Sequence, residues 1–409
     1  MTYQRLNVAV LTHSAALSGA ELSLLRLLPS VEAARVVLVL GEDGPLVEQA
    51  RGAGLQVEVV PLARASGDLR RDALDARRLP LRAALGVLVH VVVLSRHLRR
   101  LGVDVVHTSS NKAHLYGGVA ARLARRPHLW HAHDRTAPEF MPAAAVAVVR
   151  AAARWLPRLV VANSRSTLAS LPGARTPRST SPVLANPVDL EAFSVVLEQR
   201  RLRAATAATA ATGEPAPELV VGMVGRLSPW KGQDLFLRAF AEAFGQDPAV
   251  RGVVLGSALF GEDEYARSLH DLADELGLAG RVRFAGFVRD VPGALAELDV
   301  LVHASVIPEP FGQVVVEGMA AGLAVVASRE GGPAEIVTDG VDGLLFTPRD
   351  VSSLAGALRR LRHDRDLRAA LGGAAARRSA DFAAAPIARQ LEAVYDECAG
   401  GRRSRRSSR

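Results

Sequence analysis

The chain has 409 residues, 49% of them hydrophobic, and a formal net charge of +8. This length suits two domains, and the single cysteine, Cys398, excludes a disulfide within the chain and favours a reducing compartment. Five arginines lie in the last stretch, GRRSRRSSR, so the rest of the chain carries only +3, and no nucleic-acid partner is expected.

The opening stretch, MTYQRLNVAVLTHS, predicts a first strand rather than a signal peptide, because it has one arginine and only a short apolar run. No run of about 18 apolar residues follows, so no membrane-spanning helix is expected. These two features predict a cytoplasmic protein.

Short apolar runs then alternate with helical patterns such as GAELSLLRLLPSV. Apolar strands separated by helices indicate a parallel sheet covered on both faces. The pattern predicts a Rossmann-like N-terminal domain over residues 1–193. Its expected strands lie at residues 7–13, 35–41, 57–62, 103–110, 128–134 and 159–164.

Residues 194–218 are rich in Ala, Thr and Pro and show no strand signal, which predicts an inter-domain linker. The alternation of strands and helices restarts there and predicts a second doubly wound α/β domain over residues 219–375. A helix over residues 376–400 is expected to cross back to the N-terminal domain, before a disordered basic tail at 401–409. The second set of strands is expected at residues 218–228, 250–257, 281–287, 298–305, 323–328 and 343–346.

Sheets of this kind bind ligands at the carboxyl ends of their strands, and the cleft between two such domains is the expected site. In VVGMVGRLSPWKG, Arg226 and Lys231 follow a strand and precede a helix that begins near Gly232. Two cations beside a helix N-terminus suit a diphosphate, because the helix dipole and the backbone N–H groups also favour anions. The spacing is not that of a P-loop.

The stretch SVIPEPFGQVVVEGMAAG places Glu309 between two prolines at the end of a strand, and Glu317 about one turn into the following helix. An ionised carboxylate accepts two O–H bonds, so each glutamate can hold a vicinal diol. A nucleotide sugar presents one diol on its ribose and one on its sugar, with the diphosphate between them. The alternative for Glu317 is a cap or an ion pair on its own helix.

At this point GRLSPWKG and the E-x7-E element EPFGQVVVE resemble the retaining glycosyltransferases of GT-B fold. The resemblance is to the glycogen-synthase-like and phosphatidylinositol-mannosyltransferase-like kind, glycosyltransferase family 4, and covers about residues 1–375. It implies that Glu317 binds the ribose, Glu309 lies at the donor sugar, and Arg226 and Lys231 hold the diphosphate. It further implies backbone or base-side roles for Phe311, Gly312, Gln313, Gly331, Gly332 and Glu335.

In the first domain, the resemblance matches Gly19 to a glycine in the β1–α1 loop that approaches the donor phosphates and the acceptor; Ser18 stands where the family often has a second glycine. It matches His133, in WHAHDR, to a histidine that touches the donor sugar's hydroxyls. A His-x-His pair can also hold a metal, but the family needs none, so no cofactor is expected. Ser109, Ser110, Asn111 and Lys112 are acceptor-side candidates.

Residues 64–100 carry many arginines around the apolar block AALGVLVHVVVLS, at 83–95, which is too short to span a bilayer. This block is either a buried helix of the first domain or a helix that lies on an acidic membrane with its arginines on phosphates. The second alternative predicts peripheral association with the inner face of the plasma membrane.

The function expected from these features is transfer of a hexosyl unit, with retention, from a UDP- or GDP-sugar to a hydroxyl. The expected acceptor is a lipid-linked or cell-surface glycan precursor in polysaccharide biosynthesis, and no divalent metal is expected. Two alternatives stay open: another GT-B enzyme, either a nucleotide-sugar epimerase or a phosphorylase, or a non-catalytic partner that binds a nucleotide sugar or a lipid.

Overall fold

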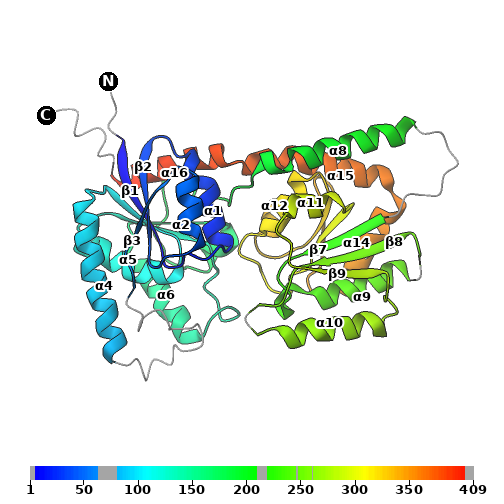
Figure 1. Ribbon diagram of the computed structural model, residues 1–409, viewed down its shortest axis with the longest axis horizontal. Coiled ribbons are helices and arrows are strands. Elements are labelled where there is room, and N and C mark those ends of the chain that lie inside the picture. The colour runs from blue at the N-terminus through cyan, green and yellow to red at the C-terminus, as the bar shows by residue number, and fades with distance from the viewer. Residues whose placement is uncertain (1–4, 63–80, 210–218, 246, 260, 401–409) are drawn as a thin grey trace. The chain divides into compact units, whose positions relative to one another are not determined.

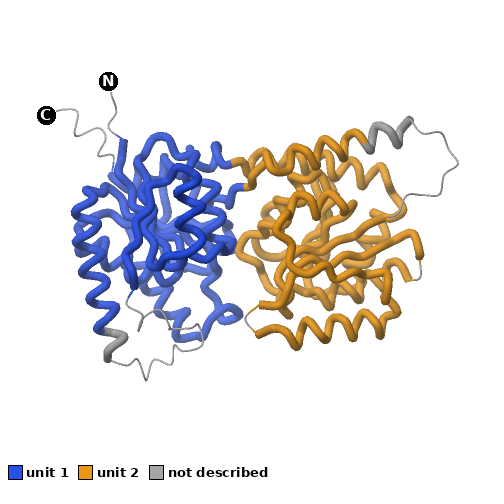
Figure 2. Tube along the Cα trace, in the orientation of Figure 1, with its two compact units in different colours: residues 1–187, 384–409 blue, residues 188–383 orange. Residues whose placement is uncertain are grey.

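The computed structural model describes residues 5–62, 81–209, 219–245, 247–259 and 261–400. The chain divides into two compact units (Figures 1 and 2), unit 1 with residues 1–187 and 384–409 and unit 2 with residues 188–383. Each unit has its own six-stranded parallel sheet, which confirms the predicted α/β class with two Rossmann-like domains.

The sheet of unit 1 has the strand order β3-β2-β1-β4-β5-β6. All its neighbouring strands are parallel. The strands are β1 (Leu6–Thr12), β2 (Ala34–Leu40), β3 (Gln56–Val59), β4 (Val105–Thr108), β5 (His128–Ala132) and β6 (Leu159–Ala162). The helices are α1 (Gly19–Leu27), α2 (Pro45–Gly52), α4 (Leu81–Arg100), α5 (Asn111–Leu123), α6 (Ala143–Trp155), α7 (Arg165–Ala169) and α16 (Ala384–Cys398), with the short η1 (Leu28–Ser30).

Both faces of this sheet are covered by helices, which is why its strands are mostly apolar; Arg35 of β2 and Glu58 of the edge strand β3 are exceptions. Side chains alternate between faces along a strand. Val8 and Val10 of β1 share a core cluster with residues of α1, α2 and α16, whereas Ala9 and Leu11 pack with α4 and α5. Figure 1 shows α4, α5 and α6 in sequence along one side of the unit.

The sheet of unit 2 has the equivalent order, β12-β11-β10-β7-β8-β9, with parallel neighbours. Its strands are β7 (Leu219–Val224), β8 (Val250–Leu255), β9 (Val282–Gly286), β10 (Val300–His303), β11 (Ala324–Ser328) and β12 (Leu344–Phe346). The helices are α8 (Leu190–Thr209), α9 (Gln233–Phe244), α10 (Asp263–Glu275), α11 (Val291–Ala296), α12 (Gln313–Ala320), α13 (Pro333–Ile336), α14 (Val351–His363) and α15 (Arg365–Arg378), with η3 (Pro229–Lys231) and η4 (Ser379–Phe382).

The prediction of an inter-domain linker was wrong for residues 194–209. The chain passes between the units at residues 187 and 188, and residues 190–209 form α8 of unit 2, while 210–218 lie outside the described residues. Alanine-rich sequence favours helix, and Phe193 and Val196 are buried. The Arg200 guanidinium also binds the carbonyls of Ala321 and Leu298. These contacts tie α8 to unit 2.

The C-terminal boundary also differs from the prediction. Unit 2 extends to residue 383 instead of 375, through the end of α15 and the short η4. The chain then returns to unit 1 as α16, which begins at Ala384 rather than at residue 376. The tail at 401–409 lies outside the described residues.

Candidate active site

The candidate site of unit 2 lies where the strand order reverses. The chain runs from β7 outward through β8 and β9 and then returns to β10, which pairs with β7 on its other side. Loops that leave two such neighbours diverge at the carboxyl edge of the sheet and leave room for a ligand. The predicted residues Arg226, Lys231 and Glu309 lie on these two loops.

The loop after β7 is held directly against the loop after β10. The amide of Val306 donates to the carbonyl of Trp230 over 2.9 Å. Gly232 has a φ of +76°, and a Cβ added there would lie 2.2 Å from the carbonyl oxygen of Ala304. A glycine is therefore required for this close approach.

The Glu309 carboxylate binds three side chains through one oxygen. Its Oε2 lies 2.8 Å from Lys231 Nζ, 2.7 Å from His303 Nε2 and 2.7 Å from Ser305 Oγ. The Lys231 ammonium also lies 4.4 Å from the centre of the Trp230 ring, close enough for a cation–π interaction. Lys231, predicted to hold the diphosphate, and Glu309, predicted to lie at the donor sugar, therefore form an ion pair in this structure.

The balance of charge around Glu309 keeps it ionised. Burial by itself would raise the pKa of this carboxyl, but the Lys231 ammonium and the His303 imidazole outweigh burial and lower the pKa well below its usual range. Glu309 is therefore an acceptor at any physiological pH.

Arg226 also has a carboxylate partner, which the sequence analysis missed. Its Nε lies 3.9 Å from Glu262 Oε2, and Glu262 Oε1 accepts a 2.6 Å hydrogen bond from Ser228. The Arg226 carbonyl accepts from the side chain of Gln233 over 2.8 Å. Arg226 and Lys231, both in the loop after β7, are thus paired with carboxylates from the loops after β8 and β10.

The E-x7-E element forms the predicted loop and helix. Helix α12 begins at Gln313 with Gly312 as its N-cap, and no side chain caps this end. Phe311 is 4% exposed, and Glu317, on the second turn of α12, is 9% exposed. The first N–H groups of α12 therefore lie only a few residues after Glu309 in the chain. The N–H groups at a helix N-terminus favour a bound anion.

Two glycines bring the loop after β11 against this element. A Cβ on Gly331 would lie 2.4 Å from the carbonyl oxygen of Glu309, and one on Gly332 would lie 2.2 Å from that of Phe311. The amide of Gly332 donates to the Glu309 carbonyl over 2.8 Å. Glu335 is on the exposed side of the short α13. The structure thus brings Gly331 and Gly332 to the Glu309 loop.

In unit 1, Gly19 is the first residue of α1, and a Cβ added there would meet nothing within 4 Å. Packing therefore does not explain a glycine at this position. The neighbouring Glu21 is buried, accepts from Thr12 over 3.0 Å and also contacts Ser18. This carboxylate ties the end of β1 to the start of α1.

His133 follows β5 at the carboxyl edge of the unit 1 sheet. Its Nδ1 lies 3.3 Å from Asn186 Oδ1, and its ring is 4.1 Å from that of His131. The imidazole is 6% exposed, and burial lowers its pKa to about 4, against a smaller opposing effect of Asn186. His133 is therefore neutral at neutral pH.

The acceptor-side candidates of unit 1 are bound within the unit. Ser109 donates to the Leu11 carbonyl over 3.4 Å. Ser110 Oγ accepts from the backbone amide of His13 over 3.2 Å and lies 2.8 Å from its ring. Asn111 donates to Asp134 over 3.3 Å. These contacts orient Ser109, Ser110 and Asn111, and the acceptor-side role of these residues and of Lys112 stays a prediction.

The histidines of unit 1 pack against one another. Within the described part of the chain, no group of three or more His, Cys, Asp or Glu side chains is arranged to hold a metal ion. His131 instead stacks between His107 and His133, with ring centres 5.4 Å and 4.1 Å away.

Three contributors to the unit 2 site escaped the sequence analysis: His303, Ser305 and Glu262. The first two had a usable signal, because alternating residues at the end of a strand, in VLVHASVIPEP, share a face with each other. Glu262 had none, since it is 34 residues from Ser228 and reaches it only through the fold.

Two sequence families match adjoining parts of the chain. The family described as Glycosyltransferase Family 4 matches residues 45–192, and the one described as Glycosyl transferases group 1 matches residues 206–378. The D-inositol 3-phosphate glycosyltransferase of Corynebacterium aurimucosum is 37% identical over 191 residues, which are 45% of this chain and 44% of that protein. The lipopolysaccharide core biosynthesis glycosyltransferase LpsE of Rhizobium meliloti is 38% identical over 157 residues, 38% of this chain and 43% of LpsE. The matches thus span less than half the length of these curated relatives.

Solved structures resemble the whole chain. The crystal structure of Anabaena Alr3699/HepE in complex with UDP is 29% identical, has a TM-score of 0.79, and covers 96% of this chain and 100% of its own. The same protein in complex with UDP-glucose has a TM-score of 0.77 with the same coverage. With a family 4 domain followed by a group 1 domain, the chain belongs to the GT-B glycosyltransferases.

Proposed function

We propose that the protein transfers a hexosyl unit, with retention of anomeric configuration, from a nucleoside diphosphate sugar to a hydroxyl. The observation that carries this proposal is the Lys231–Glu309 pair beside the uncapped N-terminus of α12, at the switch point of unit 2. Such a site offers a cation and backbone N–H groups to a diphosphate and a carboxylate to sugar hydroxyls. The UDP and UDP-glucose complexes of Anabaena HepE support a donor of this class.

In the proposed reaction, the bond between the anomeric carbon and the diphosphate oxygen breaks, and the acceptor oxygen bonds that carbon on the same face. Arg226, Lys231 and the α12 amides stabilise the charge that develops on the leaving group. A leaving phosphate oxygen takes the acceptor's proton, and Glu309 orients the sugar rather than attacking it. Because two cations supply the positive charge, the proposal needs no divalent metal.

The remaining assignments follow the family resemblance. Glu317 binds the ribose of a UDP- or GDP-sugar, and the backbone of residues 311–313 meets the sugar and phosphate. Gly331, Gly332 and Glu335 shape the base side. In unit 1, Gly19 and His133 are assigned to the phosphates and to the sugar hydroxyls.

The proposed acceptor is a lipid-linked or cell-surface glycan precursor, so the enzyme acts in polysaccharide biosynthesis. Two relatives support a polar or lipid-linked glycan acceptor. One is named a D-inositol 3-phosphate glycosyltransferase, and the other a lipopolysaccharide core biosynthesis glycosyltransferase. A protein with such an acceptor would work in the cytoplasm, at the membrane surface.

The outer layer of unit 1 supports this membrane association. The helices α4, α5 and α6 contain no Asp or Glu at all, but carry several arginines. One face of α4 is buried through Val91, Leu94 and Leu98. Large side chains are exposed elsewhere on the layer, by 39–63%: Leu85, Leu88, Val89 and Val93 of α4, Val119 and Leu123 of α5, and Val148 and Trp155 of α6.

This layer has the composition of a surface that lies on an acidic bilayer, with apolar groups inserted and arginines on phosphates. One side of α4 is buried, as the first alternative for residues 83–95 predicts, and the proposal assigns its exposed side to the membrane. No helix in the described ranges has both the length and the apolar character needed to cross a bilayer.

Replacing Leu88 and Val93 together by glutamine should weaken binding to vesicles of acidic lipid at least ~10-fold, because two inserted side chains are lost. The control, Val195→Gln with Leu202→Gln, alters an equally exposed pair on α8 of unit 2. Flotation with acidic and with neutral vesicles measures the effect. Absence of binding by the unaltered protein, with or without residues 401–409, would end the membrane proposal.

Transfer is tested with the purified chain, each of UDP-, GDP- and dTDP-hexoses, and candidate acceptors. Arg226→Ala should lower kcat about 100- to 1000-fold at saturating donor, because it removes charge from the leaving group. Glu317→Ala should instead weaken nucleotide binding about 10- to 100-fold, as expected for a lost hydrogen bond to a charged group. Arg238→Ala, on the exposed side of α9, is the control.

Wild-type turnover and donor affinity in both site variants would refute these assignments. A product formed without an acceptor would identify an epimerase, and a requirement for free phosphate would identify a phosphorylase. Binding of the donor without turnover would identify a non-catalytic partner.

A further inference from the structure

The contacts of Glu309 are concentrated on one of its two oxygens. Lys231, His303 and Ser305 all bind Oε2, at 2.7–2.8 Å. Among the residues that the structure describes, none makes a hydrogen bond with Oε1. The side chain is 12% exposed, so Oε1 remains available to hydroxyl groups of a ligand.

His303 and Ser305 are hydrogen-bond donors that the fold fixes in place. They are 3% and 1% exposed, at the end of β10 and two residues beyond it. His303 Nδ1 is buried with no hydrogen-bond partner in the described residues. An imidazole that faces a carboxylate through Nε2 and has no acceptor at Nδ1 carries its donor proton on Nε2, toward the carboxylate.

This inference rests on the proposed function. In that function Lys231 binds two anions: Glu309, as in the present structure, and the diphosphate of the donor. A buried carboxylate that loses its cation is costly unless other donors remain on it. Here the imidazole N–H of His303 and the hydroxyl of Ser305 remain on the same oxygen.

We infer that His303 and Ser305 are positioning residues that hold the Glu309 carboxylate without Lys231, so that the ammonium can move to the donor's diphosphate. Glu309 then keeps its place and its charge, and its Oε1 still accepts no hydrogen bond from the described residues. The lysine changes its partner, and the carboxylate does not move.

The test is binding of UDP, or of GDP if the wild type binds only that, measured by calorimetry at pH 7.5. His303→Leu removes the N–H at similar volume, so Glu309 should retain Lys231 and binding should weaken about 10-fold. His303→Gln restores an N–H donor and should bind within ~2-fold of wild type. Ser305→Ala should show a smaller loss than His303→Leu.

Removing the charge of Glu309 distinguishes a positioning role of His303 from a packing role. The double variant His303→Leu with Glu309→Gln should bind the nucleotide within ~2-fold of Glu309→Gln alone, because a neutral amide does not retain the ammonium. A double variant as weak as His303→Leu would show a packing role and overturn the inference. Full affinity in His303→Leu would overturn it too.

Failure of the proposed function gives a different result, since the wild type would then bind neither nucleotide. The positioning can still be tested in that case by ¹⁵N NMR of labelled histidine, in which the signal lost in His303→Gln identifies His303. A proton on Nε2 of His303, with an Nε2 signal that shifts in Glu309→Gln, is expected. Absence of a proton on Nε2, or no response to Glu309→Gln, would overturn the inference.

Discussion

Unit 1 is expected to unfold on mild acidification, between about pH 5 and pH 6. Besides His90, five buried histidines of the unit have pKa values below their ordinary one, with burial as the leading cause: about 3 for His107 and His128, about 4 for His133, and well below 6.5 for His114 and His131. Each is neutral in the folded state, whereas the unfolded chain binds protons near pH 6.5.

A group whose folded pKa is lowered contributes its full stability above the unfolded pKa, and this is lost as pH falls toward the folded pKa. Each histidine therefore costs about 1.4 kcal/mol for each pH unit below 6.5. The five together should cost about 7 kcal/mol at pH 5.5, comparable with the whole stability of a typical domain, about 5–15 kcal/mol.

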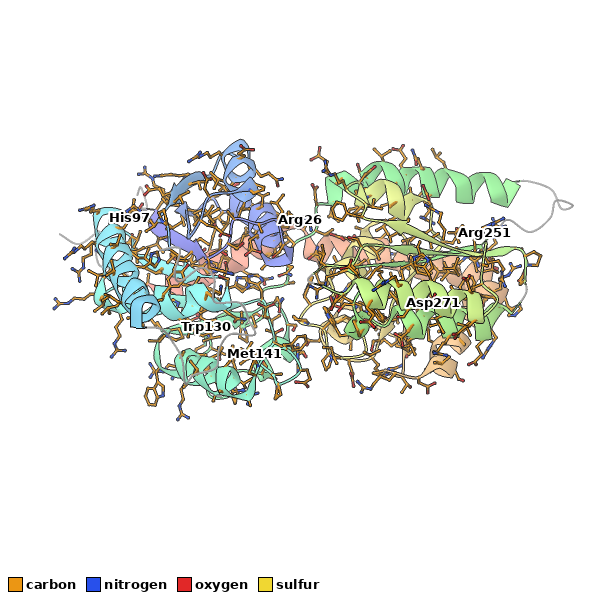
Figure 3. The ribbon with its side chains drawn as sticks, turned by 60° about the horizontal axis from the view of Figure 1, so that its bottom comes forward. Arg26, His97, Trp130, Met141, Arg251 and Asp271 are labelled. Atoms are coloured by element: carbon orange, nitrogen blue, oxygen red, sulfur yellow. The ribbon has the colours of Figure 1, made fainter. Side chains whose placement is uncertain are left out.

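Their surroundings offer an incoming proton little compensation. Thr108 Oγ1 lies 2.7 Å from His114 and 2.8 Å from His128, and the His107 ring faces the Tyr395 hydroxyl at 2.8 Å. The His114 ring stacks on Trp130, inside unit 1 (Figure 3), with centres 4.1 Å apart. None of these contacts supplies a carboxylate, so protonation leaves an unpaired buried charge.

Hydrogen exchange at pH 7.5 and pH 5.5, followed by mass spectrometry, measures the effect on peptides from β4 and β5. Peptides from β7 and β8 of unit 2, which contain no histidine, provide the internal reference. Equal protection of β4 and β5 at both pH values, after correction for intrinsic exchange, would contradict the prediction.

Gly232→Ala is expected to destabilise unit 2 by about 2–5 kcal/mol. The new Cβ would meet the carbonyl oxygen of Ala304 at 2.2 Å, in a backbone conformation with φ of +76°. Left-handed backbone costs a non-glycine residue about 1–2 kcal/mol, and forced repacking adds about 1–3 kcal/mol. The loops after β7 and β10 must separate, so Lys231 and Glu309 move apart and activity is lost.

Gly280→Ala is the matched control, because Gly280 has a φ of +75° in the same unit but nothing within 4 Å of an added Cβ. Gly280→Ala should lower the free energy of unfolding only by the cost of left-handed backbone, about 1–2 kcal/mol, and should retain activity. Denaturant unfolding gives both free energies. Equal losses in the two variants would show that the close approach to Ala304 has no energetic consequence.

Much of the fold could be predicted because its signals are local. Each run needed to be short, mostly apolar and bounded by a helical pattern, and those properties can be read from neighbouring residues alone. Residues 194–209 failed this test, since composition alone does not distinguish an alanine-rich linker from a helix. Arg200, Phe193 and Val196 decide that question through residues distant in the chain.

The candidate site was predictable in part for the same reason. Motif spacing places Arg226, Lys231 and Glu309 after strand ends, where a parallel sheet binds its ligands, and Glu317 on the helix that follows. The same motif did not reveal that Lys231 and Glu309 contact each other, because 78 residues separate them. The pairing of Arg226 with Glu262 was hidden in the same way.

By itself, the sequence determined the two doubly wound sheets, the strand ends that carry chemistry and the family, because each depends on residue type at short spacing. Only the tertiary structure decided which charges pair, that three donors share one Glu309 oxygen, and that unit 1 buries its histidines as neutral rings. Those outcomes depend on distance and burial in space, and the strand order that sets them brings together segments far apart in the chain.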